Sequence, residues 1–340
     1  MSGETPGEEG CVKISVIIPA YNSEATIQAT LDSVLRQTVP PDEILVMDDG
    51  STDQTASILK SYEPRVTIFR QPNGGVARAR NVLCANASGD LIAFLDHDDV
   101  WHPQYLEFQR KHFMIYPNAV AFFTGHVDFY GYEPYEWAQD RTGVEESAEV
   151  IDPPAFLHQL RTASRNFGSA SFLCVPKRVL MQIGKEPFSE RVSGGDDRYF
   201  CLLSAIYGSV VYFPFPLVAY RITREAQSAD TMKSCGLGVE IFQLLEATYR
   251  RSANISLLRE FQTGFASKRR SYAKLLMGAG RVEEAREQLR KALHGGPASV
   301  AKSLAWLFLI SMPSRMHPTW PSSQRPLSGQ AWKWRRWKAQ

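Results

Sequence analysis

The sequence has 340 residues, of which 44% are hydrophobic and 22% are charged. This length and composition exclude a disordered chain and predict one large domain with a smaller appendage. The formal net charge of +2, from 38 basic and 36 acidic residues, gives no signature of a nucleic-acid-binding protein. The five cysteines are scattered without a CxxC pair, which favours a reducing compartment. The acidic N-terminus lacks a signal-peptide pattern, so we expect a cytoplasmic protein.

Strands and helices are predicted to alternate after a disordered tail over residues 1–12. Short apolar runs predict the strands, and apolar residues at helical spacing predict the helices between them. The predicted strands cover residues 14–18, 43–47, 66–69 and 91–95, and the predicted helices cover residues 23–37, 54–61 and 76–87. This order predicts an α/β fold with βαβ units and a mostly parallel sheet flanked by helices. Right-handed crossovers would bring the polar segments 19–22, 48–53, 73–75 and 96–99 to one edge of the sheet, where a ligand is expected.

Three carboxylates follow the fourth predicted strand, at Asp96, Asp98 and Asp99. Acids this close repel one another, and their hard oxygen atoms favour Mg²⁺ or Mn²⁺, a metal that substrate phosphates usually help to bind. The alternative is an acidic loop in which Asp99 caps the following helix. After the second strand, Asp48 and Asp49 have no evident task if the segment is a plain turn.

Four successive motifs resemble those of the family 2 glycosyltransferases in both order and spacing. They lie at residues 15–22 (SVIIPAYN), 48–53 (DDGSTD), 73–81 (NGGVARARN) and 95–103 (LDHDDVWHP). The resemblance implies a GT-A nucleotide-diphospho-sugar transferase fold over residues 13–232 and inversion of configuration at the anomeric carbon. It also implies a nucleotide-diphospho-sugar donor, by default a UDP-sugar, and an acceptor hydroxyl.

The same resemblance assigns residues to the metal and to the donor. Asp98 and Asp99 are expected to hold Mg²⁺ or Mn²⁺, with Asp96 at the metal or nearer the donor sugar. Many relatives have a histidine where this chain has Thr223, so Arg221 or Arg224 is the expected diphosphate contact. The residues expected at the donor are Pro19, Ala20, Tyr21, Asn22, Asp49, Gly75, Arg80, Asp96 and Arg221.

An acid pair, Asp196 and Asp197, follows two glycines further along the chain. It resembles the family's Glu-Asp pair, which starts a helix beside the acceptor site, and by this resemblance Asp197 is the candidate general base. The alternative is that either acid caps a helix running to residue 207. Around the pair, strands are predicted over residues 120–124, 168–175, 210–214 and 217–221, and a short helix over residues 176–183.

The pattern becomes helical after residue 232. Residues 233–312 are predicted to form a helical region with one hairpin of tetratricopeptide type, and a single unit cannot build a stacked array. The helix over residues 299–312 is apolar enough to lie on a membrane interface, or alternatively to pack onto the hairpin. Residues 313–340 form a basic, tryptophan-rich tail that suits lipid headgroups or solvent. One expectation is therefore a peripheral contact with the cytoplasmic face of the inner membrane.

These features together predict an inverting, metal-dependent glycosyltransferase of polysaccharide, lipopolysaccharide or other glycoconjugate biosynthesis. Its acceptor is expected to be a saccharide or a lipid-linked saccharide. A nucleotidyltransferase would share the sheet and the metal-binding acids, but residues 20–23 are not the basic phosphate-binding loop such an enzyme needs. The other alternative is a catalytically inactive, transferase-like assembly protein of a polysaccharide complex. The presence of both acid clusters counts against that loss of activity.

Overall fold

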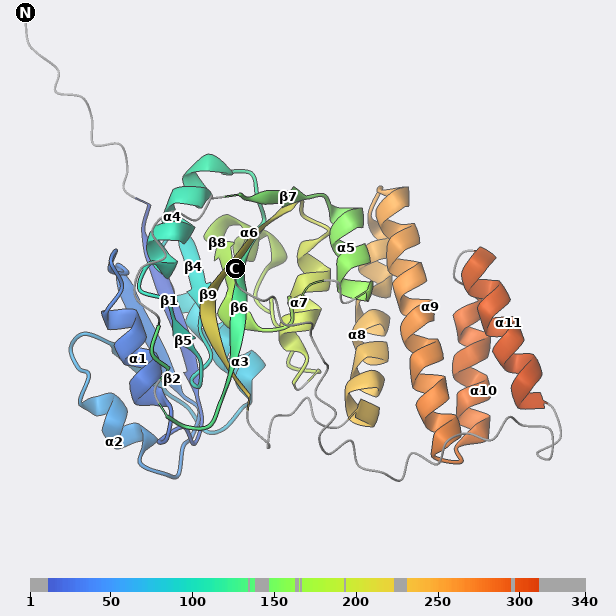
Figure 1. The fold of residues 1–340 in the computed structure, drawn as a ribbon, viewed down its shortest axis with the longest axis horizontal. Coiled ribbons are helices and arrows are strands. Elements are labelled where there is room, and N and C mark those ends of the chain that lie inside the picture. The colour runs from blue at the N-terminus through green and yellow to red at the C-terminus, as the bar shows by residue number, and fades with distance from the viewer. Residues whose placement is uncertain are drawn as a thin grey trace, which may run out of the picture. The chain divides into compact units, whose positions relative to one another are not determined.

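The computed structural model describes residues 12–133, 135–137, 147–162, 165, 167–192, 194–222, 231–294 and 297–311. The chain divides into two compact units, residues 1–264 and 265–340, and the division falls within helix α9 (Ile255–Gly278). Figure 1 labels the elements of both units. Of the N-terminal tail predicted over residues 1–12, residues 1–11 lie outside the described residues, as does the whole tail predicted over residues 313–340. Thr223 and Arg224 also lie outside the described residues.

Strands and helices alternate through the first half of the first unit, as predicted. The strands are β1 (Ile14–Ala20), β2 (Glu43–Asp48), β3 (Thr67–Arg70), β4 (Leu91–Phe94), β5 (Val100–Trp101), β6 (Ala121–Tyr130), β7 (Glu149–Ile151), β8 (Leu173–Pro176) and β9 (Val210–Ile222). The helices of this unit are α1 (Ile27–Leu35), α2 (Thr55–Lys60), α3 (Val76–Asn86), α4 (Tyr105–Ile115), α5 (Pro153–Thr162), α6 (Lys177–Ile183), α7 (Asp196–Ser204), α8 (Thr231–Arg251) and the first part of α9.

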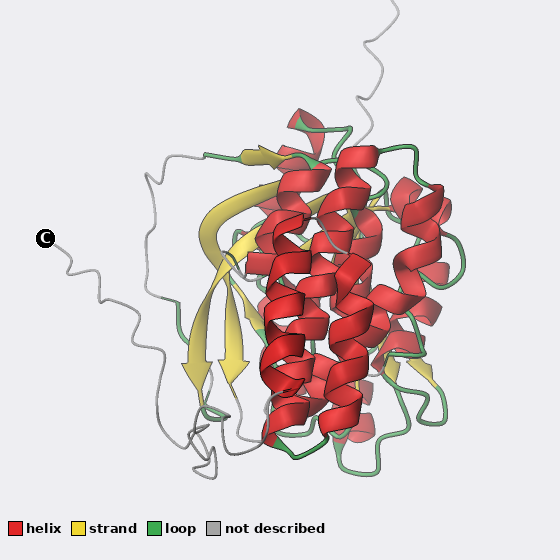
Figure 2. Ribbon diagram, turned by 90° about the vertical axis from the view of Figure 1, so that its right-hand side faces the viewer, coloured by secondary structure: helices red, strands yellow, loops and turns green. Residues whose placement is uncertain are grey.

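The strands form one mixed sheet in the order β3-β2-β1-β4-β8-β6-β9-β5, with β7 beside β9. The neighbours β3, β2, β1 and β4 are all parallel, which confirms the predicted βαβ half of the fold. Strand β8 runs antiparallel to both β4 and β6 and joins this half to the rest of the sheet. Figure 2 shows how strongly the strands twist. The predicted α/β class is confirmed, with a parallel half and a mixed half.

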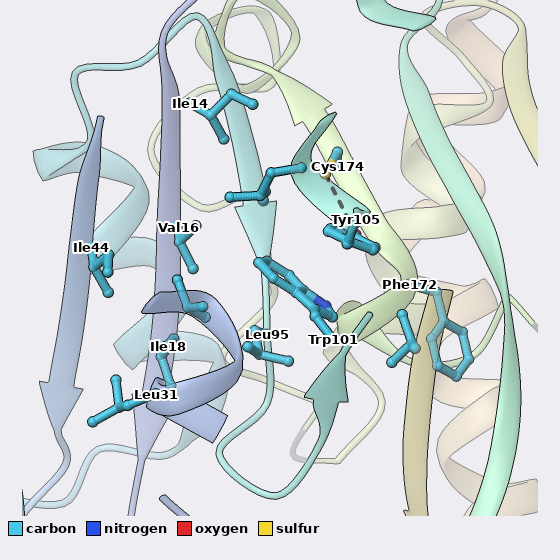
Figure 3. Close-up of a cluster of buried hydrophobic side chains, with 14 of the residues drawn as sticks. Ile14, Val16, Ile18, Leu31, Ile44, Leu95, Trp101, Tyr105, Phe172 and Cys174 are labelled. Atoms are coloured by element: carbon cyan, nitrogen blue, oxygen red, sulfur yellow. Dashed lines mark hydrogen bonds between the residues drawn. The ribbon is translucent and has the colours of Figure 1, made fainter. Parts of the chain in front are cut away.

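A buried aromatic cluster fixes the loop after β4. All seven residues of β1 are buried, because both faces of this central strand are covered. Trp101 and Tyr105 lie in this cluster (Figure 3), and their rings stack with 4.1 Å between ring centroids. Trp101 Nε1 donates to the Ser171 carbonyl at 3.1 Å. Leu95 is also buried in this cluster. The loop over residues 96–99, with its three acids, is therefore held between the buried side chains of Leu95 and Trp101. Burial of each such side chain stabilises the fold by about 1.5–3 kcal/mol.

Two predicted strand segments differ in the structure. Residues 170–172 form a 3₁₀ turn, because Ser169 Oγ accepts from the Ser171 N–H at 3.1 Å and bends the chain before β8. The two strands predicted at residues 210–214 and 217–221 are one strand, β9, whose pairing with β6 shifts register at Gly125. A Cβ on Gly125 would lie 2.6 Å from the Pro214 carbonyl oxygen, so only glycine permits this close approach.

The second unit contains the end of α9, α10 (Val282–Lys291) and α11 (Pro297–Ser311). Helix α11 is joined to its neighbours by side chains. Arg270 donates to Ser299 Oγ, Lys274 lies 4.8 Å from the Trp306 ring centroid, and Arg286 Nη2 donates to the Ile310 carbonyl at 3.2 Å. The predicted packing of this helix onto the hairpin is therefore present. Among the described residues, no helix is both long and apolar enough to cross a membrane.

Gly89 leaves no room for a side chain where β1 and β4 meet. A Cβ there would lie 2.6 Å from Ser15 Oγ and 2.7 Å from the Ser15 backbone nitrogen. We expect Gly89→Ala to lower the free energy of unfolding by roughly 1–3 kcal/mol, because strand backbone must move. Gly278→Ala, with no atom within 4 Å of the added Cβ, is the control and should leave stability unchanged or slightly higher. Urea unfolding followed by circular dichroism measures both, and equal effects would contradict the close packing at Gly89.

Candidate functional site

The carboxyl ends of β1, β2 and β4 share one edge of the sheet because these strands are parallel neighbours. Ala20 in β1 pairs with Asp48 in β2, and the Asp49 N–H donates to the Ala20 carbonyl at 2.8 Å. Leu95, just after β4, donates its N–H to the Ile17 carbonyl at 3.1 Å. The polar segments that follow these strands therefore begin side by side, as expected for a ligand-binding edge.

Asp48 and Asp49 have structural tasks, and the interpretation that they lack one is wrong. Asp49 accepts from the backbone N–H groups of Gly74 and Gly75 at 2.9 and 2.8 Å, one on each carboxylate oxygen. Asp48 accepts from the Ser51 N–H at 2.9 Å. Gly75 has a φ of 87°, which glycine adopts without strain, and helix α3 begins directly after it. Asp49 thus fixes the turn that leads into α3.

Tyr21 presents its side chain at this edge. Its exposed fraction is 44%, whereas Pro19 and Ala20 are buried within β1. Asn22 follows in a left-handed conformation with a φ of 45°, and its Oδ1 accepts from the Thr52 N–H at 2.9 Å. This bond joins the loops after β1 and β2. The exposed phenol ring of Tyr21 therefore stands on a fixed turn, where a flat ligand group could stack on it.

The three acids after β4 are in different surroundings. Asp99 is fully buried, its Oδ1 accepts from the Arg221 N–H at 2.8 Å, and its Oδ2 is without a hydrogen-bond partner among the described residues. Burial, and then the charges of Asp98 and Asp96, raise the pKa of Asp99 well above its ordinary value. Burial also raises the pKa of Asp98. Helix α4 is preceded by Gln104 and no side chain caps it, so the alternative that Asp99 caps this helix is wrong.

Arg221 clamps the acidic loop from β9. It is 3% exposed, its Nε donates to the Asp98 carbonyl at 2.7 Å, and its Nη1 donates to the Gly131 carbonyl. The guanidinium lies 4.4 Å from the Phe129 ring centroid. Its Nη2 is buried with no hydrogen-bond partner in the part of the chain that the structure describes. The predicted contact of Arg221 with a diphosphate stays a prediction.

Arg80 lies between the two acid clusters. Its exposed fraction is 4%, and its Nη2 and Nη1 donate to Asp96 and Asp196 respectively. Burial alone would lower the pKa of Arg80, but the two carboxylates outweigh it and hold the guanidinium charged. Both terminal nitrogens are therefore engaged by acids, and the predicted contact of Arg80 with a diphosphate stays a prediction.

Asp196 and Asp197 occupy the first turn of α7 after Gly195, and neither is the residue at the capping position. Asp196 is buried, whereas Asp197 is partly exposed and its Oδ1 accepts from the Arg198 N–H at 2.6 Å. Burial and the neighbouring Asp196 charge raise the pKa of Asp197 to about 7, although Arg80 opposes this rise. A carboxyl group that ionises near neutral pH is suited to general-base chemistry.

Two aromatic side chains that sequence reasoning did not assign a role lie near the acids. Tyr220 on β9 is partly exposed, and burial followed by the charges of Asp99 and the other acids raises its pKa. His126 on β6 stacks on Phe172 with 4.3 Å between ring centroids and meets Tyr220 edge-on at 6.0 Å. Side chains alternate between the two faces of a strand, so the sequence could have placed His126 and Tyr220 on one face of the sheet only if the pairing of β6 with β9 were known.

The acids fit a divalent cation. Asp99 Oδ2 is a buried oxygen without a partner among the described residues, and like charges around it favour the binding of a cation. In the same described ranges, no three His, Cys, Asp or Glu side chains are close enough to hold an ion by themselves. The protein would therefore supply one or two carboxylates, from Asp98 and Asp99, and leave the other positions to phosphate oxygens and water, as is usual for Mg²⁺.

The fold and the site define an α/β protein with an acid-rich ligand edge and a second acid pair facing it across a buried arginine. Residues 15–180 match the sequence model of Glycosyl transferase family 2. Almost half of the chain, all of it in the first unit, therefore matches this family, and the predicted resemblance is confirmed.

Similar proteins support this assignment. Over 117 residues the chain is 40% identical to the UDP-Glc:alpha-D-GlcNAc-diphosphoundecaprenol beta-1,3-glucosyltransferase WfgD of Escherichia coli, a match that covers 34% of this chain and 46% of that protein. The chain thus spans less than half the length of this relative. Staphylococcus aureus TarS in complex with UDP-GlcNAc superposes with a TM-score of 0.62 at 18% identity, over 88% of this chain and 90% of that one. The mannosyltransferase PcManGT of Pyrobaculum calidifontis, in complex with GDP-Man and Mn2+, superposes at 0.55 and 18% identity, over 89% and 85%. These two structures confirm the predicted GT-A fold.

The raised pKa of Asp197 makes a prediction for stability. Because the folded-state pKa lies above the unfolded value, the contribution of Asp197 to stability is most favourable at low pH and is lost as the pH rises toward 7. Asp197→Asn removes the buried charge, so its melting temperature relative to the wild type should rise between about pH 5 and about pH 8. Asp53→Asn is the control. Burial would raise the Asp53 pKa, but hydrogen bonds from Thr55 and Glu24 outweigh it and lower this pKa. The difference in melting temperature between Asp53→Asn and the wild type should therefore stay constant across this pH range. Thermal unfolding measures both, and a constant difference for Asp197→Asn would contradict the raised pKa.

Proposed function

We propose that this protein transfers a sugar from a nucleotide-diphospho-sugar to an acceptor hydroxyl with inversion at the anomeric carbon. The observation that carries the proposal is the pairing of two acid groups with different tasks. The pKa of Asp197 is raised to about 7, while Asp98 and Asp99 concentrate negative charge in the loop whose Asp96 shares Arg80 with Asp196. The match to the family and the relatives' names support a transferase over a binding protein.

The reaction needs a base and a stabilised leaving group. Asp197 would accept the proton of the acceptor hydroxyl as its oxygen attacks the anomeric carbon, and a base so placed contributes roughly 10²–10⁴-fold. The C–O bond to the diphosphate breaks as the new C–O bond forms on the opposite face of the sugar. A divalent cation, when bound, would neutralise the charge that develops on the diphosphate. Asp98 and Asp99 would hold that ion, and Asp96, bound by Arg80, would lie beside the donor sugar.

The donor is proposed to be a UDP-sugar. WfgD is named for UDP-Glc, and TarS was solved with UDP-GlcNAc. At the nucleotide end, Tyr21 offers an exposed ring, and the turns fixed by Asn22 and Asp49 surround it. The Asp49 oxygens already accept backbone N–H groups at 2.8–2.9 Å, so contact with the base would add to that set.

The acceptor is proposed to be a saccharide, and in particular a lipid-linked one. WfgD acts on a sugar diphosphoundecaprenol, which fits assembly of a cell-surface polysaccharide at the cytoplasmic face of a membrane. The catalytically inactive assembly protein is less well supported, because both acid clusters are complete and engaged with one arginine. No observation favours a nucleotidyltransferase.

A nucleotide-sugar panel tests the transfer reaction. UDP-glucose and UDP-N-acetylglucosamine, with and without Mn²⁺, are the first donors, read by calorimetric binding and by slow donor hydrolysis. We expect metal-dependent binding of one donor, loss of that binding in Asp98→Ala, and retained binding with a roughly 10²–10⁴-fold lower rate in Asp197→Asn. Asp152→Asn, which alters an exposed hydrogen bond at the start of α5, is the control and should behave like the wild type. Absence of binding of any nucleotide sugar under all metal conditions would contradict the proposal.

We also propose that α11 contacts an anionic membrane surface. Leu304 and Phe308 lie four residues apart on this helix and are 51% and 66% exposed. The chain has no Asp or Glu after Glu287, while residues 312–340 contain six Arg or Lys and four Trp. An exposed apolar stripe next to cations is the pattern of interfacial helices that bind anionic lipids.

Vesicle sedimentation tests the membrane contact. The full chain should sediment with vesicles containing phosphatidylglycerol more than with pure phosphatidylcholine, and added salt should reduce the difference. The double variant Leu304→Ser/Phe308→Ser should bind several-fold less, because about 0.8 kcal/mol is lost for each CH₂ group that no longer enters the lipid. Met181→Ser, at another exposed apolar residue, should bind like the wild type. Equal binding by all three proteins would contradict the contact through α11.

A further inference from the structure

Arg80 binds one aspartate close to it in the sequence and a second, Asp196, that lies 116 residues further along the chain. On one side its Nη2 donates to Asp96, directly after the buried strand β4, and on the other its Nη1 donates to Asp196 in the first turn of α7. Arg80 and Asp196 are nearly inaccessible to solvent and Asp96 is partly exposed, so the three side chains form an acid–arginine–acid bridge around a buried guanidinium. Such a bridge holds its members closely, because separating them leaves a buried charge unpaired.

The surroundings keep Arg80 in one position. The next residue, Asn81, donates its Nδ2 to the Phe188 carbonyl at 2.8 Å and accepts the Phe188 N–H at 3.0 Å. The Arg80 guanidinium lies 5.6 Å from the Phe188 ring centroid, and that ring packs against Phe94 and Phe200 at 5.2 and 5.1 Å between centroids. Strand β4, helix α3 and helix α7 are thus tied together around this one side chain.

We propose that Arg80 is a positioning residue for the transfer reaction: it fixes the spacing between the donor-side acids and the α7 base, and it supplies the positive charge against which Asp197 is ionised. This inference rests on the proposed function, in which Asp197 is the base. It replaces a diphosphate contact by Arg80, since that contact would leave Asp96 and the buried Asp196 without their cation.

The charges around Asp197 explain why Arg80 matters for the base. Asp197 is faced by Asp196 from its own helix, by Asp96 from the end of β4 and by Arg80 from α3, and it accepts the Arg198 N–H. Tyr220 from β9 and Cys201 from α7 also lie within its electrostatic reach and stay neutral at physiological pH. Arg80 lowers the pKa of Asp197, whereas Asp196 and Asp96 raise it. Removing the arginine charge therefore makes the base harder to ionise.

Three variants test this role through the pH dependence of kcat/KM for the acceptor, measured at saturating donor and metal. In the wild type, kcat/KM should fall at low pH with a midpoint near the Asp197 pKa of about 7, and this fall is the acid limb of the profile. Arg80→Met should move this limb upward by about one pH unit, which is about a tenfold loss in kcat/KM on its acid side. Asp196→Asn should move the limb downward, because it removes a neighbouring negative charge. Arg80→Lys should keep the limb near its wild-type position and lower kcat, since one ammonium cannot span both acids as the guanidinium does.

The matched control is Arg65→Met, which removes an exposed arginine stacked on Tyr62 and should not change the profile. If Arg80→Met does not fold, the double variant Arg80→Met/Asp196→Asn buries one charge fewer and should fold, with its limb between those of the single variants. Carboxyl NMR titration of Asp197 in metal-free protein should show the same shifts without any turnover.

The outcomes separate this inference from the proposed function. If the wild type transfers sugar and the limb and NMR titration of Asp197 are the same in Arg80→Met, Arg80→Lys and the wild type, the positioning role is wrong while the transferase stands. If the wild type transfers no sugar from any donor, the proposed function is wrong, and the NMR titration alone then tests whether Arg80 controls the ionisation of Asp197.

Discussion

The site depends on the burial of several carboxylates around a single guanidinium. Asp96 and Asp196 share Arg80, while Asp99 keeps one buried oxygen without a partner among the described residues. Burying an ion costs several kcal/mol even after relaxation, so the surrounding fold must supply that free energy. The aromatic residues near Trp101 and Phe188 supply it through apolar burial. The protein therefore uses its stable core to hold an acidic site that would not assemble by itself.

The two halves of the sheet divide the chemistry. The parallel half, β3-β2-β1-β4, ends in the loops that carry Tyr21, Asp49 and the acids after β4. The mixed half contributes Arg221 from β9, and the chain between β8 and β9 contributes Asp197 on α7, the proposed base. Strand β8 joins the halves through antiparallel pairs with β4 and β6. The residues proposed for the donor and for the acceptor thus come from different parts of the fold, and Arg80 links the two through Asp96 and Asp196.

Much of this could be predicted from the sequence. Apolar runs and turn residues predicted the four parallel strands, and their order brought residues such as Asp48 and Asp98 to one edge. The partners of Arg80 could not be predicted, because a contact across 116 residues leaves no local pattern. The same holds for Asp49, whose carboxylate is occupied by backbone N–H groups of a later turn. The raised pKa of Asp197 depends on burial, which no sequence motif records.

The stereochemistry of transfer tests the central claim most directly. A single base at Asp197, with the leaving diphosphate on the opposite face of the sugar, allows one displacement and therefore inversion. Proton NMR of the first-formed product from an α-linked UDP-sugar donor reads the anomeric coupling before any equilibration. We expect the β-linked product. An α-linked product would contradict the account, because retention requires a second displacement and a nucleophile that these residues do not provide in this arrangement.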